Sequence, residues 1–451
     1  MPNLCLNFDF SPSISKLLKP YDYIIAGGGC AGLSLAYYLS DSTLSNKRVL
    51  IIDNDDKQRN DRTWCFWTSE PMGFDDILTR QWPSLAVIDE QGERRELLGG
   101  SPYKMIRGID FYRKVQKKLA ALPNFEFHRA FISNMGETES GAYVVADGQR
   151  FEASWVFNSC FRPRQVEKQP GRHHLLQHFS GWWIRTEEPA FQPETGVLMD
   201  FRTPQYSSTR FFYVLPLSER EALVEYTVFS TRLLHKKSYE RALEAYIRAT
   251  LGVAGYSVLE QERGVIPMTD QAFPQQLSPH IINLGTIGGA VKPTTGYAFL
   301  NIQKQVCAIV AQLEQEVSPL PAPLRPSRFS FYDRLLLNIL QYFGEEGKPI
   351  FSRLFHRNKM GTILRFLDER TSFWEETKIF ASLPILPFLR ALGRVYVLTP
   401  LQYWFSGAGN TSAAKAQGNQ SLLSTLQQKP ALKADFAPER GLARLKNEPM
   451  P

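Results

Sequence analysis

Cysteine is scarce in this chain of 451 residues, and its five cysteines lie far apart: Cys5, Cys30, Cys65, Cys160 and Cys307. An odd number of widely spaced thiols argues against a disulfide framework and against a four-thiolate zinc site. Free thiols are typical of a reducing compartment. His174 and His178 have helical i, i+4 spacing, but their segment lacks the glutamate of the HExxH zinc motif. We therefore expect no metal site.

Long apolar runs are also missing. No stretch reaches the ~18 uninterrupted apolar residues of a membrane-spanning helix. Residues 1–20 contain Asp9 and lack the basic leader of a secretory signal. The composition, with 43% hydrophobic and 22% charged residues, is typical of globular proteins. Aromatic residues make up 12% of the chain, which permits aromatic-lined cavities. The net charge of +7 suits nucleic acid, acidic metabolites or an anionic membrane surface, and charge alone does not choose among them.

A glycine-rich segment, GGGCAG at residues 27–32, stands between an apolar run expected to form a strand and an expected helix. Its glycines have the GxGxxG spacing that permits a tight turn, close approach of a pyrophosphate, and packing of the helix on the strand. The helix N-terminus also attracts phosphate. A second apolar run ends in an acid placed to bind an adenosine ribose. The pattern predicts a dinucleotide site formed by Gly27, Gly29, Cys30, Ala31, Gly32 and Asp53.

We expect FAD rather than NAD as the tightly bound cofactor. The motif stands near the start of the sequence, as in flavoproteins related to glutathione reductase, and no second fingerprint of this kind follows.

The fold class predicted along the chain is α/β, a Rossmann-like FAD-binding domain interleaved with an antiparallel β-sheet substrate domain and followed by a helical region. We assign 21–170 and 260–320 to the FAD-binding domain and 171–259 to the substrate domain. Residues 321–405 are basic and aromatic and form a helical subdomain that faces a membrane or is buried. Residues 406–451, rich in Ser, Ala, Gln, Lys and Pro, are expected to be a disordered tail.

Several segments in a fixed order carry a family resemblance: YDYIIAGGGCAGLSLAYYL (21–39), DRTWCFW (61–67), YKMIRGIDFY (103–112), LLQHFSGWW (175–183), RFFYVLPLSEREALVEYTVFS (210–230), RGVIPMTD (263–270), NLGTIGGAVKPTTGYAF (283–299) and RFLDER (365–370). Together they resemble the bacterial lycopene β-cyclases. The chain departs from that family where an acidic pair reads Glu225-Tyr226, and from flavin hydroxylases where Gly285 is followed by Thr286.

The resemblance implies redox-neutral cyclisation of the linear ends of lycopene, or a similar carotene, to β-ionone rings. The implied cofactor is reduced FAD, with NAD(P)H as reductant. We expect Pro293 to Gly296 to open a long helix whose N–H groups hold negative charge on the flavin. The further cofactor-binding residues that we expect are Arg107, Gly285, Thr286, Pro293 and Gly296.

Glu225 is the predicted catalytic acid. Cyclisation requires a proton to be delivered to a double bond and another to be removed from a ring carbon, and a buried carboxyl with a raised pKa can do this. Glu225 lies on an expected strand among Leu223, Thr227 and Phe229, a largely apolar face on which a carboxyl is either buried or at a rim. Asp368 and Glu369 are expected to carry surface charge or form salt bridges, with catalysis as the alternative.

The resemblance also implies a cytoplasmic protein, peripheral at the inner face of the cell membrane, with a carotene partner and no nucleic acid. Two other classes stay open: a flavin-dependent monooxygenase or isoprenoid reductase, and a non-enzymatic protein that binds carotenoid or a membrane surface.

Overall fold

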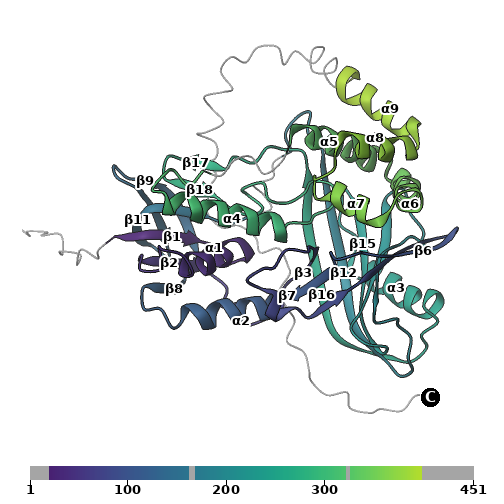
Figure 1. Ribbon diagram of the computed structural model, residues 1–451, viewed down its shortest axis with the longest axis horizontal. Coiled ribbons are helices and arrows are strands. Elements are labelled where there is room, and N and C mark those ends of the chain that lie inside the picture. The colour runs from purple at the N-terminus through teal and green to yellow at the C-terminus, as the bar shows by residue number, and fades with distance from the viewer. Residues whose placement is uncertain (1–19, 162–167, 321–325, 399–451) are drawn as a thin grey trace, which may run out of the picture. The chain divides into compact units, whose positions relative to one another are not determined.

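The structure is a computed structural model that describes residues 20–161, 168–320 and 326–398; the predicted tail lies outside this part of the chain. Figure 1 shows the described elements, which form three sheets with helices packed against them.

The first sheet has parallel strands at its centre. β1 (Tyr21–Ala26) lies between β2 (Val49–Asp53) and β11 (Gln149–Asn158). β1 and β2 are mostly apolar because both of their faces are buried, in two separate core clusters. The remaining strands are β8 (Phe125–Arg129), β9 (Ile132–Glu137), β10 (Ala142–Ala146), β17 (Gln276–Ser278) and β18 (Ile281–Asn283). Helices α1 (Cys30–Ser40), α2 (Gly108–Leu119) and α4 (Phe299–Glu314) share a core with it. The predicted nucleotide-binding fold is confirmed.

The second sheet has seven strands in the order β16-β12-β15-β14-β13-β5-β6. Its strands are β5 (Ser84–Asp89), β6 (Gly92–Leu97), β12 (His174–Thr186), β13 (Thr195–Asp200), β14 (Thr209–Pro216), β15 (Glu221–Ser230) and β16 (Tyr256–Thr269). β14 and β15 pair in antiparallel fashion as a hairpin. β5 joins β13 in parallel. This sheet therefore draws on both segments assigned to the FAD-binding domain, through β5 and β6 before residue 171 and through β16 after residue 259.

A three-stranded sheet joins these two parts through β3 (Thr63–Trp67), β4 (Arg80–Trp82) and β7 (Tyr103–Arg107). One face of the second sheet packs on the C-terminal helices, and the other packs on α3 (Lys236–Ala245) and the π-helical turn Tyr246–Thr250 (Figure 1). The C-terminal helices are α5 (Ser327–Tyr342), α6 (Gly347–Arg357), α7 (Met360–Leu367), α8 (Phe373–Ser382) and α9 (Ile385–Gly393). Short helical turns lie at Asp75–Ile77, Gly344–Glu346 and Arg394–Leu398.

Among the described helices, none is by itself long and apolar enough to cross a membrane. Residues Phe373–Ser382 and Ile385–Val397 meet that criterion only as a pair, across a bend of 106°.

Candidate active site

The glycine-rich turn has the geometry that a dinucleotide requires. Gly27 has a φ of +103°, which favours glycine, and a Cβ on Gly32 would lie 2.0 Å from the Gly27 carbonyl oxygen. Gly29 faces a cavity, and a Cβ there would meet no atom within 4 Å. Helix α1 starts at Cys30 without a side-chain cap. Its first N–H groups are therefore available to a phosphate.

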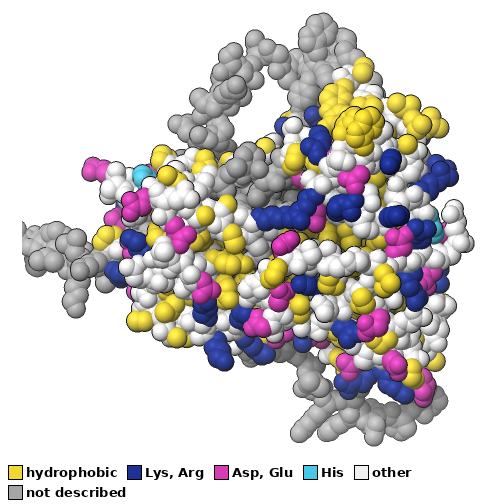
Figure 2. All heavy atoms as spheres, viewed as in Figure 1, with side chains coloured by type: hydrophobic (Ala, Val, Ile, Leu, Met, Phe, Trp, Pro, Cys, Tyr) yellow, Lys and Arg dark blue, Asp and Glu magenta, His cyan; other side chains and the backbone are white. Residues whose placement is uncertain are grey.

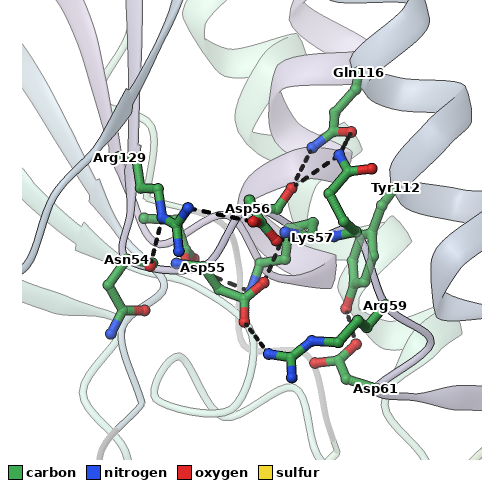
Figure 3. Close-up of polar contacts among 11 residues, drawn as sticks. Asn54, Asp55, Asp56, Lys57, Arg59, Asp61, Tyr112, Gln116 and Arg129 are labelled. Carbon is green, nitrogen blue, oxygen red and sulfur yellow. Dashed lines mark hydrogen bonds and ion pairs between the residues drawn. The ribbon is translucent and has the colours of Figure 1, made fainter.

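Asp53 closes this turn from the end of β2. Its Oδ2 accepts a hydrogen bond from the Gly28 N–H at 2.6 Å, and its Oδ1 lies 3.5 Å from the Lys57 ammonium. Figure 3 shows how the loop that follows is fixed: Arg129 pairs with Asp56, and Tyr112 donates to Asp61 at 2.8 Å. The loop after β2 is thus held in place beside the glycine-rich turn by contacts from α2 and β8 as well as by its own backbone.

A cavity of about 610 Å³ extends from this turn to the second sheet. That volume is in the range of small-molecule and cofactor sites. Most of the predicted cofactor residues line it: Gly27, Gly29, Cys30, Ala31, Asp53, Gly285, Thr286 and Gly296. Gly32 acts instead in packing α1 on the turn. Arg107 and Pro293 do not line the cavity; Arg107 pairs with Glu260 and lies over the Trp183 ring.

The loop between β18 and α4 forms one wall of the cavity. Gly285 has a φ of +59° and Gly296 a φ of +73°, and Gly285 also donates its N–H to Gln305 Oε1 at 2.9 Å. The helix begins at Phe299, so the expectation that Pro293 to Gly296 open it is wrong. These residues form an irregular loop one turn earlier, because Gly296 requires a left-handed conformation.

Glu225 lies on the cavity side of β15. Leu223 and Phe229, on the same face of this strand, belong to the core shared with the C-terminal helices. Its Oε1 accepts a hydrogen bond from Thr227 Oγ1 at 2.8 Å. Burial raises the pKa of Glu225 well above its ordinary value, and the neighbouring Glu262 raises it further. The carboxyl is therefore suited to hold a proton at neutral pH.

Glu262, which was not predicted, lies beside it on β16. Its side chain accepts a hydrogen bond from Thr63 Oγ1 at 2.6 Å and one from Trp183 Nε1 at 3.4 Å. Burial raises the pKa of Glu262, and these donors oppose that effect. Within the described residues, no Lys, Arg or His lies within ion-pair distance of either carboxyl. Because β16 carries Glu260, Glu262 and Arg263 close together, no signal in the sequence singled out Glu262.

Three tyrosines line the cavity near this pair. Tyr103 and Tyr297 are joined by a hydrogen bond of 3.1 Å between their hydroxyls, and Tyr213 is opposite Glu225 in the pairing of β14 with β15. Burial raises the pKa of all three. They stay neutral and present hydroxyls and ring faces to the cavity.

Asp368 and Glu369 do not line this cavity. They border a smaller one, of about 50 Å³, that also meets Tyr297. Asp368 accepts a hydrogen bond from Trp67 Nε1 at 2.9 Å, and Lys292 lies 2.7 Å from Glu369 and 3.3 Å from Asp333. The expected salt bridging is confirmed for Glu369, whose side chain is only 9% exposed and is therefore not a surface charge.

The two histidines with i, i+4 spacing do not form a metal-binding motif on a helix. His174 and His178 are on strand β12, so their spacing does not place them on a helix face. His178 is fully buried and contacts Ser230 and Tyr239 at 2.8 and 2.6 Å. Burial lowers the pKa of His178 to about 4, so it is neutral at physiological pH.

Solved structures define the fold class. A flavoprotein/dehydrogenase from Cytophaga hutchinsonii has a TM-score of 0.57 at 10% identity, covering 83% of this chain and all of that one. A geranylgeranyl bacteriochlorophyll reductase-like protein from Thermoplasma acidophilum has a TM-score of 0.52 at 11% identity, covering 85% of this chain and 98% of that one. The chain therefore shares the fold of these two proteins.

The family follows from the sequence. The family described as "Lycopene cyclase protein" matches residues 22–393, and the chain belongs to it. The lycopene beta cyclase of Arabidopsis thaliana is 26% identical over 64% of this chain and 60% of its own length. A neoxanthin synthase of Solanum tuberosum is also 26% identical, over 61% and 57%. The chain thus matches about three fifths of the length of these relatives.

Proposed function

We propose that the protein catalyses the redox-neutral cyclisation of the linear ends of lycopene to β-ionone rings, giving β-carotene by way of the one-ring carotene. The observation that carries this proposal is the Glu225–Glu262 pair in the cavity that starts at the glycine-rich turn, with no cation from the described residues within ion-pair distance of either carboxyl. Such a pair can donate and accept a proton on an apolar substrate.

The residues of the turn fit FAD. Gly27, Gly29 and the N-terminus of α1 would hold the pyrophosphate, and Asp53 the ribose. The open space at Gly29 and the uncapped helix supply room and hydrogen-bond donors for this group. Reduced FAD, maintained by NAD(P)H, would supply negative charge near the reacting carbons without net electron transfer.

The chain itself supplies the proton donor, the stabilising carboxylate and the wall of the cavity. Glu225 would protonate the terminal double bond, and the ionised Glu262 would stabilise the resulting cation. Tyr103, Tyr213 and Tyr297 line the cavity and would orient the end group. Because the proton gained is balanced by a proton lost, the product has the mass of the substrate.

Product mass tests this function. Purified protein with FAD, NADPH and lycopene-loaded liposomes should convert lycopene to a product of unchanged mass bearing β-ionone rings, with far less than one NADPH oxidised per ring. A product that has gained oxygen would identify a monooxygenase, and one that has gained hydrogen would identify a reductase. Binding without conversion would identify a carrier. Each of these outcomes contradicts the proposal.

We further propose that the protein binds to the inner face of the cell membrane through α8 and α9, with no nucleic-acid partner. Figure 2 shows a hydrophobic patch over these helices beside basic side chains. Trp374 is 73% exposed, and Lys378 and Arg390 are exposed nearby. Other exposed apolar residues here are Phe373, Ile385, Leu386 and Leu389. A carotene dissolves in lipid, so an entrance at a membrane surface would be useful.

Vesicle flotation tests this surface. Binding should strengthen with anionic lipid, weaken with salt, and fall sharply in Leu386→Asp. Leu97→Asp changes a leucine on β6 that is 78% exposed, against 66% for Leu386, and is the matched control. Deletion of residues 406–451 should leave binding intact. The surface is wrongly assigned if that deletion abolishes flotation while Leu386→Asp does not.

A further inference from the structure

Gly181 is the reason that two carboxyls meet in this cavity. In the second sheet β12 lies between β15 and β16, and Gly181 is paired with Glu225 on one side and with Glu262 on the other. A Cβ at this position would lie 3.0 Å from Glu262 Cγ and 2.9 Å from Leu223 Cδ1. Strands two apart are separated by about 9.5 Å. Two glutamate side chains can span this gap only because the central residue has no side chain.

The two carboxyls have different surroundings. Glu262 accepts hydrogen bonds from Thr63 on β3 and from Trp183 on β12, whereas the hydrogen bond at Glu225 comes from Thr227. Donors stabilise the ionised form, so Glu262 carries the charge and Glu225 the proton. The titratable groups facing the pair from the packed elements are Cys65, Tyr103, Tyr213, Glu260 and Tyr297, of which Glu260 is paired with Arg107.

We propose that Glu262 is a second catalytic residue: its charge keeps the proton on Glu225 before the reaction, and its carboxylate takes the proton that ring formation releases. This inference rests on the proposed cyclisation. The acid and the base are then two adjacent carboxyls, on the strands that flank β12, instead of one carboxyl that performs both steps.

The two carboxyls can supply and accept every proton that the reaction moves, and no electrons are gained or lost. The Glu225 proton passes to one carbon of the terminal double bond, and the other carbon becomes cationic. The next reacting double bond attacks that carbon, a C–C bond forms, and the positive charge moves onto the ring. Loss of a ring proton to Glu262 restores a double bond. Transfer of this proton to the neighbouring Glu225 resets the site, with no oxidant, reductant or water consumed.

The position of the base then decides which ring forms. The cyclic cation has hydrogens on more than one adjacent carbon, and the proton removed sets the position of the new double bond. Glu262 is held by contacts from β3 and β12. A base fixed in this way gives one ring isomer, whereas a displaced base would give a mixture.

Substitutions at the pair test the inference on the flavin-loaded protein. Glu262→Gln should lower turnover at least ~100-fold with flavin content unchanged. The double variant with Glu225→Gln should be no slower than the slower single variant, because residues that act as a unit are non-additive. Glu262→Asp should give ring isomers with a displaced double bond, and Glu225→Asp should slow the reaction without changing the ring. Glu221→Gln, a surface glutamate paired with Arg185, is the control.

Near-normal turnover in Glu262→Gln, multiplying losses in the double variant, or an unchanged ring in Glu262→Asp would each overturn the inference. A wild-type protein that forms no rings would overturn the proposed function as well, which separates the two failures. If Glu262→Gln does not fold, Gly181→Ala should still slow turnover more than Gly196→Ala, which crowds only apolar neighbours and aromatic carbon. Equal turnover in these two would count against the inference.

Discussion

The Glu225–Glu262 pair and the cluster of Asp333, Glu369 and Lys292 are two buried acidic groups, each beside a cavity that Tyr297 borders. They differ in their counter-charge. Lys292 lies between two carboxylates in the second group, whereas in the described part of the chain the first has no cation within ion-pair distance. A buried carboxylate with a cation stays ionised and holds structure together. A buried pair without one keeps a proton and is available for chemistry.

The largest expected effect concerns stability and the cluster that has a cation. Lys292→Met removes the ammonium between two buried carboxylates, and breaking such a pair costs about 3–5 kcal/mol. Urea denaturation would measure the loss in free energy of unfolding. Lys348→Met removes the partner of the exposed Glu90 and should cost no more than about 1 kcal/mol. Equal losses in the two variants would show that the buried cluster has no special structural role.

The next effect concerns rate and the pair that lacks a cation. Glu225→Gln keeps the size of the side chain but removes the proton donor, so turnover should fall at least ~100-fold, or about 2.7 kcal/mol in activation free energy. Asp368→Asn makes the same chemical change in the smaller cavity and should leave turnover within a few-fold. The comparison requires matched flavin content and melting temperature. A larger loss in Asp368→Asn would reverse the assignment of the two sites.

A smaller effect is the pH dependence of stability. The pKa of Glu225 is raised from 4.5 in the folded protein. At a pH between the unfolded-state pKa and the raised folded-state pKa, the folded protein holds a proton that the unfolded chain has lost. The free energy of unfolding therefore falls as pH rises, by at most ~1.4 kcal/mol per pH unit. Glu225→Gln should remove this slope and gain stability relative to the wild type from about pH 5 to about pH 8. A constant difference across that range would contradict a raised pKa.

Local patterns predicted the dinucleotide-binding half well. The glycine spacing, the apolar strands and the acid at Asp53 are all contained in about thirty residues that follow one another in the chain. Glu225 could be chosen from the sequence as the catalytic acid because alternate residues of one strand share a face, and its neighbours on that face are largely apolar. Tyr226, one residue on, packs on the opposite face of the sheet with α3, so an acid there would not reach the cavity.

The pairing of Glu225 with Glu262 could not be predicted in this way. It depends on the register of three strands that are far apart in the sequence, and on the glycine between the two carboxyls. The buried positions of Asp368 and Glu369 depend in the same way on Trp67 and Lys292, from distant segments. Register and burial of this kind are set by the assembled core, and no window of the sequence contains them.

The central claim is that Glu225 carries a proton at neutral pH. The infrared difference spectrum between the wild type and Glu225→Gln at pH 7, read in the carbonyl region of protonated carboxylic acids, tests it most directly. The account predicts a band in the wild type that is absent from the variant, and no such difference for Glu221→Gln. A spectrum that shows only ionised carboxylate lost from the wild type would contradict it.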